Sequence, residues 1–324
     1  MSKPAPILIA DVKRFMPVST LLGLIGNTPL IELTHLSPKK GIHIFAKLEG
    51  QNPSGSIKDR IALAMVEQAE ISGDLKPGDT IIEASSGNTA ISLALIAKQR
   101  GYLVRVIIPG EVAPSIGDLL ELYGAEITWC EPRAGMKGAI DLAMELAREP
   151  GCHYLGQFDN QINLETHYRT TGEEIAQALP QVDVLVAGIG TGGTITGVGR
   201  RLREANPDLQ IVGVEPRMGE ALQGLRSLSE GYVPPLLDLS QLSRRFLVDS
   251  ATAIEAAHMI VEKEGLLAGI SSGATLHAAL RASVDLAEGN IVVMFSDGGW
   301  KYLPARPWDA ARAGAKDLDE THWW

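Results

Sequence analysis

Cysteine is scarce in this sequence: Cys130 and Cys152 are the only two among 324 residues, and they form no CxxC pair. Such isolated cysteines exclude a disulfide framework and a cysteine-based metal cluster, and they are typical of a reducing compartment. Runs of lysine and arginine are also missing, and the net charge of −10 argues against a nucleic-acid partner. The N-terminal apolar patch PILIA is too short for a membrane span and lacks the layout of a signal peptide. We therefore expect a cytoplasmic protein with no nucleic-acid or membrane partner.

The rest of the composition indicates a globular protein with more than one core. Hydrophobic residues make up 45% and charged residues 21% of the chain, and 324 residues suit two domains. Apolar runs that are continuous rather than alternating are typical of parallel strands covered on both faces, and here they take turns with helix-periodic runs. This order predicts an α/β fold of mostly parallel sheets flanked by helices. The expected strands are residues 43–48, 80–83, 103–108, 126–129, 182–187, 210–215 and 290–295, and the expected helices are residues 58–72, 89–100, 115–123, 136–148, 165–179, 193–205, 253–264 and 272–287.

The division into domains is expected near residues 150–157. We assign residues 46–155 to a smaller α/β domain, and residues 1–45 together with 156–324 to a larger one. The stretch 230–243 is rich in proline, leucine and aspartate and predicts a long loop. The tail, residues 304–324, contains Trp308, Trp323 and Trp324, so part of it is expected to dock on the body of the protein.

Residues 52–60, NPSGSIKDR, place a lysine at the start of a helix. Gly55 permits a sharp turn, Ser56 is the expected N-cap, and an apolar helix-periodic run follows Lys58. The positive end of the helix dipole disfavours an ammonium there, so the free amine of Lys58 is favoured. A neutral, positioned amine can form a Schiff base with an aldehyde cofactor. Taken alone, however, such a pattern more often marks a surface lysine.

Residues 184–197, VLVAGIGTGGTITG, predict a strand, a glycine-rich turn and a helix. Gly190, Gly192 and Gly193 permit close approach of a ligand to the backbone, and the N–H groups of the following helix form an anion site. The hydroxyls of Thr191 and Thr194 add further donors. Because no lysine follows, the turn is not a Walker P-loop.

The same turn has a competing interpretation as a dinucleotide site. Gly188, Gly190 and Gly193 satisfy GxGxxG, and Glu215 ends the next expected strand, where an acid would bind a ribose. Against this interpretation, the threonine hydroxyls suit a phosphate monoester, and a dinucleotide leaves Lys58 without a role.

Residues 81–90, IIEASSGNTA, again predict a strand, a tight loop and a helix. Ser85, Ser86 and Thr89 offer hydroxyls beside helix N-terminal amides, which suits a carboxylate, and Asn88 can donate to a phenolate oxygen. An ordinary capped helix start is the alternative. Together the three loops supply a Schiff-base lysine, a phosphate cup and a carboxylate cradle, which describes pyridoxal phosphate holding an amino acid.

A series of motifs supports this interpretation: IGNTPL at 25–30, KLEGQNPSGSIKDR at 47–60, SSGNT at 85–89, ELYGAEI at 121–127, GIGTGGTITG at 188–197 and GISSGA at 269–274. With them the chain resembles, over about residues 20–303, the fold-type II pyridoxal-phosphate enzymes of the tryptophan synthase β-like fold, and among these the cysteine synthases. VEPRMGE at 214–220, EGYVP at 230–234 and DGGWKYL at 297–303 are similar to the cysteine synthase B type that takes O-phosphoserine.

The resemblance implies roles for the residues that match these motifs. Lys58 would hold the cofactor as a Schiff base and later move the Cα proton. Asn88 would donate to the ring 3′-oxygen, and Ser271, with Ser272 as the alternative, would face the pyridine nitrogen. The phosphate would be held by Gly190, Thr191, Gly192, Gly193 and Thr194. The substrate carboxylate would be bound by Ser85, Ser86, Thr89 and Gln157. No metal is implied.

The implied activity is a β-replacement that forms L-cysteine from an O-activated L-serine and a sulfur donor through an aminoacrylate intermediate. The serine would be O-phospho-L-serine, O-acetyl-L-serine or both, and the donor sulfide, thiosulfate or a thiocarboxylated carrier protein. A homodimer is expected. The alternatives are another β-eliminase such as a serine dehydratase, a non-catalytic pyridoxal-phosphate-binding protein and an NAD-binding Rossmann enzyme. The intact lysine argues against the non-catalytic alternative.

Arg217 carries the expectation of an O-phosphoserine substrate. It follows the expected strand 210–215 and so lies at a strand carboxyl end, where α/β sites assemble. Its guanidinium matches a phosphate in shape and charge. The alternative is that Arg217 pairs with Glu215 or Glu220.

Some positions depart from the family pattern. Ala90 stands where the family has the last glycine of SGNTG, and Gln161 and Glu173 stand where prolines are common. The segment 110–118, GEVAPSIGD, lacks the usual sequence of a mobile loop. These departures leave domain closure and the sulfur donor open.

Overall fold

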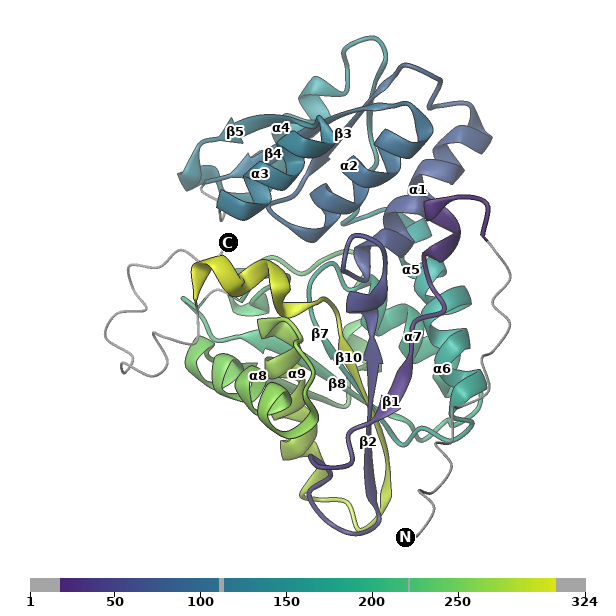
Figure 1. Ribbon diagram of the computed structural model, residues 1–324, viewed down its shortest axis with the longest axis vertical. Helices are drawn as coiled ribbons and strands as arrows, with labels where there is room; N and C mark the ends of the chain where they lie inside the picture. The colour runs from purple at the N-terminus through teal and green to yellow at the C-terminus, as the bar shows by residue number, and fades with distance from the viewer. Residues whose placement is uncertain (1–17, 111–113, 221, 307–324) are drawn as a thin grey trace, which may run out of the picture.

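The computed structural model describes residues 18–110, 114–220 and 222–306, which form two sheets with helices on both faces of each. Figure 1 shows the unit with the smaller sheet above the unit with the larger sheet. This arrangement confirms the predicted α/β class. Within the described residues, no helix has the length and apolar character needed to cross a membrane.

The larger sheet has six strands in the order β1-β2-β10-β7-β8-β9. All neighbours in it are parallel except β1 and β2. Successive side chains of β7 point to opposite faces: Val184 and Val186 pack with α8 and α9, and Leu185 and Ala187 pack with α7. The strands are β1 (Leu30–Glu32), β2 (Ile42–Leu48), β7 (Val184–Gly188), β8 (Gln210–Pro216), β9 (Arg244–Val248) and β10 (Gly289–Phe295).

The smaller sheet has four parallel strands in the order β5-β4-β3-β6. Ile81 of β3 packs with α1 and α2 on one face, and Ile82 packs with α4 on the other. Burial on both faces explains why these strands are continuous apolar runs. The strands are β3 (Thr80–Ala84), β4 (Leu103–Pro109), β5 (Glu126–Cys130) and β6 (Cys152–Tyr154).

The helices begin close to the predicted positions. They are α1 (Lys58–Ser72), α2 (Asn88–Arg100), α3 (Pro114–Tyr123), α4 (Gly135–Leu146), α5 (Gln161–Thr166), α6 (Glu173–Ala178), α7 (Gly193–Arg203), α8 (Ser250–Glu264) and α9 (Ile270–Ser283). Short 3₁₀ segments occur at Leu21–Leu24, Glu49–Gln51, Pro132–Ala134, Leu228–Glu230, Leu239–Gln241 and Gly299–Ala305.

The single helix predicted at 165–179 is wrong in one respect, because a π-helical turn, His167–Gly172, separates α5 from α6. A Cβ atom on Gly172 would come within 2.8 Å of the Arg201 side chain, so glycine lets this turn pack closely on α7. Strands β1, β6 and β9 were not predicted. They are short and lie at sheet edges, where pairing with a neighbour matters more than apolar content.

The division into domains stays a proposal, with one adjustment. A boundary at residue 46 would cut β2, which belongs to the larger sheet, so we begin the smaller unit after β2. The other boundary, at 155, falls just after β6. Trp308, Trp323 and Trp324, whose stretch of the tail was expected to dock on the body of the protein, lie outside the described residues. Residues 111–113 of the atypical loop also lie outside them.

Candidate active site

Loops from both sheets line one cavity of about 430 Å³. Residues 85–89 reach it from the carboxyl end of β3, Gly190 and Thr191 from that of β7, and Pro216 from that of β8. Lys58, the first residue of α1, completes the lining. Because parallel strands present their carboxyl ends at one edge, side chains distant in sequence can reach one ligand here.

Lys58 lines both this cavity and a smaller one beside it. Burial and the positive charge of Arg226 lower the pKa of the Lys58 amine from 10.5 to about 8, although Asp297 acts in the opposite direction. The predicted direction agrees with this shift, but burial rather than the helix dipole is the largest cause. The expectation of Ser56 as N-cap is wrong: Ile57 takes that position, and the Ser56 hydroxyl accepts from the Lys58 N–H at 3.3 Å.

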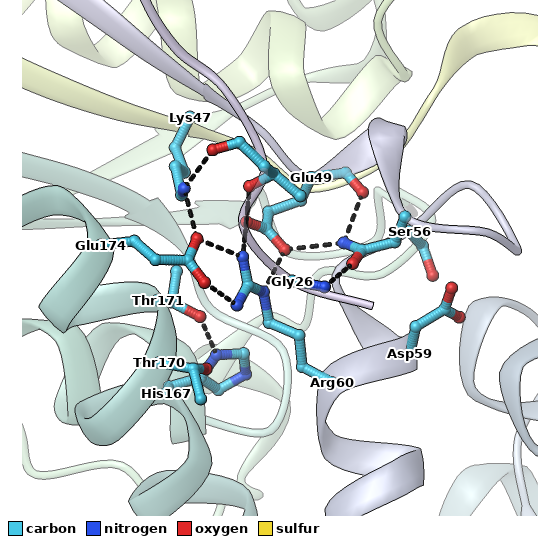
Figure 2. Close-up of polar contacts among 12 residues, drawn as sticks. Gly26, Lys47, Glu49, Ser56, Asp59, Arg60, His167, Thr170, Thr171 and Glu174 are labelled. Carbon is cyan, nitrogen blue, oxygen red and sulfur yellow. Dashed lines mark hydrogen bonds and ion pairs between the residues drawn. The ribbon is translucent and has the colours of Figure 1, made fainter. Parts of the chain in front are cut away.

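A buried ion-pair network ties the segment around Lys58 to the larger unit (Figure 2). Arg60 donates to Glu49 at 2.7 and 2.9 Å and to Glu174 of α6 at 2.6 and 2.7 Å. Lys47 of β2 also donates to Glu174, at 2.6 Å. Burial opposes the charge on Glu174, but Arg60 and Lys47 outweigh it and hold its pKa at about 2. Two cations and two carboxylates balance, which allows the group to be buried.

The glycine-rich turn after β7 forms the wall of the smaller cavity through Gly190, Thr191, Gly192 and Thr194. Gly192 has φ +85°, and a Cβ atom there would come within 2.6 Å of the Leu237 backbone nitrogen. A Cβ atom on Gly193 would come within 2.1 Å of Asn163 Oδ1. Glycine at both positions therefore allows this close packing, and the N-terminus of α7, which begins at Gly193, suits an anion.

Two side chains outside the glycine-rich turn contact the hydroxyls of Thr191 and Thr194. Asn163 Nδ2 donates to Thr191 Oγ1 at 3.0 Å, and His167 Nε2 lies 3.1 Å from Thr194 Oγ1. Burial, with the charges of Lys58 and Arg60, lowers the pKa of His167 well below 6.5. Among the described residues, the lining of the smaller cavity contains no carboxylate, so its donor set fits a phosphate monoester beside an amine, as pyridoxal phosphate requires.

The two serine candidates for the pyridine nitrogen differ in position. Ser271 lines the smaller cavity. Ser272 is fully buried, and its Oγ has no hydrogen-bond partner among the described residues. The positions favour Ser271, the first choice from sequence, and its role stays a prediction.

The four residues expected to bind the substrate carboxylate, Ser85, Ser86, Thr89 and Gln157, all line the larger cavity, and their role stays a prediction. Thr89 Oγ1 donates to Gln157 Oε1 at 2.6 Å, and the Gln157 amide donates to a backbone carbonyl at 3.0 Å. Ser85 Oγ accepts from two backbone N–H groups at 3.3 Å, which leaves its own proton for a ligand.

A buried carboxyl beside the cradle has a raised pKa. Burial raises the pKa of Glu83 to about 8, although backbone N–H groups, including that of Gln157, donate to it. A protonated Glu83 removes a negative charge that would repel a substrate carboxylate.

Asn88 lines both cavities and is held by two residues that had no assigned role in the sequence. Its Nδ2 donates to Asp297 Oδ2 at 2.9 Å, and its Oδ1 accepts from Lys301. Both partners lie in the DGGWKYL motif. The resemblance therefore pointed to this stretch, but it did not show that Asp297 and Lys301 contact Asn88.

The loop after β8 adds donors that sequence reasoning missed. Gln223, Arg226 and Ser227 line the larger cavity. The Nε2 of Gln223 and the Oγ of Ser227 are buried without a hydrogen-bond partner among the described residues. The Arg226 guanidinium lies 4.8 Å from the centre of the Phe158 ring. The sequence of this loop has no periodic pattern, so it could not indicate that these three side chains line a cavity.

Arg217 lies outside the set of residues that line the cavity. Its side chain is 62% exposed and pairs with Asp249 at 3.1 Å. The alternative partners were Glu215 and Glu220, but Glu215 pairs with Arg245 and Glu220 accepts from Ser250.

Glu215 also decides against the dinucleotide interpretation. Its carboxylate is buried, pairs with Arg245 at 3.0 Å and accepts from the Leu228 N–H at 2.5 Å. A ribose would have to displace both partners.

Comparison with known proteins agrees with this geometry. Residues 21–297 match the family described as pyridoxal-phosphate dependent enzyme. A cysteine synthase of Staphylococcus aureus is 40% identical over 297 residues, covering 89% of this chain and 96% of the relative. Cysteine synthase B of Pseudomonas aeruginosa is 40% identical over 291 residues, covering 90% and 97%. The crystal structure of O-ureido-L-serine synthase superposes with a TM-score of 0.86 at 35% identity, covering 93% and 98%.

Proposed function

The chain belongs to the family of pyridoxal-phosphate dependent enzymes, and from this premise we propose that it is a cysteine synthase, which forms L-cysteine from an O-activated L-serine and a sulfur donor. The observation that carries the proposal is Lys58, an amine of lowered pKa between a phosphate cup and a carboxylate cradle. Pyridoxal phosphate supplies an electron-withdrawing ring that acidifies Cα of the amino acid, so that a β substituent can leave.

The side chains around this group bind, orient and move a proton. Lys58 would hold the cofactor through its aldehyde carbon and would take the Cα proton, because among the described residues it is the basic side chain that lines both cavities. The Ser85 hydroxyl donates to the substrate carboxylate, and Thr89, whose own hydroxyl proton goes to Gln157 Oε1, orders the cradle beside it. The Ser271 hydroxyl, which lines the smaller cavity, would face the pyridine nitrogen and, being neutral, would not keep it protonated.

For the leaving group we propose phosphate, with acetate also accepted. Arg226, rather than Arg217, binds it, together with the free amide of Gln223 and the hydroxyl of Ser227. O-Acetylserine ends in a neutral ester and gains little from a cation, whereas a phosphate matches a guanidinium in charge and shape.

The test of the proposed function is cysteine formation by the purified protein. Wild type with sulfide and O-phosphoserine or O-acetylserine should form cysteine, and Lys58→Ala should lose the reaction and the covalently held cofactor. Lys98→Ala, on the exposed side of α2, is the control and should keep both. Turnover by Lys58→Ala would contradict the assignment.

The product of the reaction also distinguishes a cysteine synthase from the other candidate in the family, a β-eliminase. A β-eliminase such as a serine dehydratase would release pyruvate in place of cysteine.

We further propose a cytoplasmic homodimer, and sulfide, thiosulfate or a thiocarboxylated carrier protein as the sulfur source. Light scattering and assays with each donor in turn test these points.

A further inference from the structure

Lys301 is a buried lysine that the proposed chemistry leaves without a function. It lies in the short helix after β10, with only 5% of its surface exposed. Burial lowers the pKa of its ammonium, while the carboxylates of Asp297 and Asp59 oppose that effect. A buried ammonium is unfavourable unless its partners replace the lost hydration. We therefore expect this lysine to do something that an apolar residue of similar size could not.

The partners of Asn88 determine how its amide lies. The Lys301 ammonium can only donate, so the amide oxygen faces it. The Asp297 carboxylate can only accept, so the amide nitrogen faces it, at 2.9 Å. Lys301 and Asp297 therefore favour the same orientation of the Asn88 amide. Asp297 takes one of the two amide protons, and no described protein group takes the other.

Asp297 itself is firmly placed. The Tyr302 hydroxyl donates to its Oδ2 at 2.7 Å, and Lys301 Nζ lies 3.7 Å from the same oxygen. On its other side, a Cβ atom on Gly269 would come within 1.9 Å of Asp297 Oδ1, so glycine allows the carboxylate to pack against the backbone. Lys301 and Asp297 therefore form a fixed platform on the larger unit, and Asn88 meets it from the first turn of α2.

We propose that Lys301 is a positioning residue for the cofactor: its ammonium holds the Asn88 oxygen, Asp297 holds one amide proton, and the remaining N–H is directed into the cavity toward the ring 3′-oxygen. This inference rests on the proposed function through the role of Asn88. A residue at 301 with no N–H donor would no longer hold the amide oxygen, which could then turn toward the cofactor, where two oxygens would repel each other.

The competing explanation is that Lys301 only neutralises the nearby Asp59 and Asp297. Under that explanation its loss weakens the fold without acting through Asn88. A double-mutant cycle separates the two, because residues that act through one contact give losses that do not add.

The experiment measures the dissociation constant of pyridoxal phosphate and the absorbance spectrum of the bound cofactor. Lys301→Met should weaken binding by about tenfold and change the spectrum, as Asn88→Ala should. In the Asn88→Ala background, Lys301→Met should add less than about twofold. Lys98→Met, on the exposed side of α2, makes the same substitution away from Asn88 and Asp297 and should keep the wild-type spectrum.

Additive losses, or an unchanged spectrum in Lys301→Met, would overturn the inference. Lys301→Gln keeps an N–H donor at similar reach and should retain more affinity than Lys301→Met; an equal or larger loss would also overturn it, and this comparison serves if the methionine variant does not fold. Absence of cysteine formation in wild type with cofactor binding intact would instead contradict the proposed function.

Discussion

At the scale of single residues, the reactivity of Lys58 depends on groups that the helix around it does not supply. Burial is the main cause of its low pKa, and Arg226, from a loop of the larger unit, is the second. The same arginine is the proposed ligand of an anionic leaving group, so under that proposal it would also favour the neutral amine beside it.

The pH dependence of cofactor uptake follows from this pKa. Only the neutral amine attacks an aldehyde, so the rate at which cofactor-free protein takes up pyridoxal phosphate should rise with pH, with a midpoint of about 8. Arg226→Met removes a nearby cation, which raises the Lys58 pKa and should move the midpoint upward. Stopped-flow absorbance measures the rate, and Arg169→Met, on the exposed side of its helix, should leave the midpoint unchanged. A midpoint near 10 in wild type would contradict the assignment.

Substrate choice is the second prediction at this scale. Arg226→Ala should lower kcat/KM for O-phosphoserine by about 10- to 100-fold, the effect of one charge-assisted contact, and lower that for O-acetylserine far less. Arg217→Ala tests the residue expected from sequence, and it should affect both substrates little because Arg217 pairs with Asp249. The reverse pattern would restore Arg217 as the phosphate ligand.

At the scale of elements, the network of Arg60, Glu49, Glu174 and Lys47 joins three segments. It connects β2 and α1 to α6, so the turn before Lys58 is held from both units (Figure 2). The charged residues of the KLEGQNPSGSIKDR motif are thus mainly structural, and Lys58 is the residue of the motif that faces both cavities.

Breaking this network should be much more harmful than breaking a surface pair. Arg60→Met leaves the fully buried Glu49 carboxylate without its main cation and should reduce the free energy of unfolding by about 3–5 kcal/mol. Arg100→Met removes partly exposed pairs with Glu67 and Glu70 and should cost about 0–1 kcal/mol. Urea titration measures both, and equal losses would argue against the network as an anchor.

At the scale of the whole molecule, the cofactor site is shared by the two units. Asn88 comes from the smaller sheet's side, whereas Ser271 and the glycine-rich turn come from the larger. A ligand bound there contacts both, and binding to the folded state alone must stabilise it.

Removal of pyridoxal phosphate should therefore lower the melting temperature, and adding it back should restore the original value. At a free concentration of 100 times the dissociation constant, the gain is about 2.7 kcal/mol. Pyridoxal without the phosphate should restore much less, because it leaves the cup of Gly190–Thr194 empty. Calorimetry of the three states checks this, and equal recovery with pyridoxal would locate the phosphate elsewhere.

Local chemistry explains what could be predicted from sequence. Lys58, the hydroxyls of Ser85 and Thr89 and the turn around Gly192 were found because strand, glycine turn and helix start are encoded in adjacent residues. The long buried strands were predicted for the same reason, while β1, β6 and β9 depend on pairing with one neighbouring strand at the edge of a sheet.

The sequence by itself determined the α/β class, through the order of its apolar and helix-periodic runs, and the cofactor, through the motifs of the loops that we propose bind it. Only the tertiary structure decided which cation enters the cavity, because a position at a strand end does not say where a side chain points, and Arg217 turns to Asp249. It also brought Asp297 to Asn88 across 209 residues. Contacts of that kind depend on how two units pack, and no local pattern contains that information.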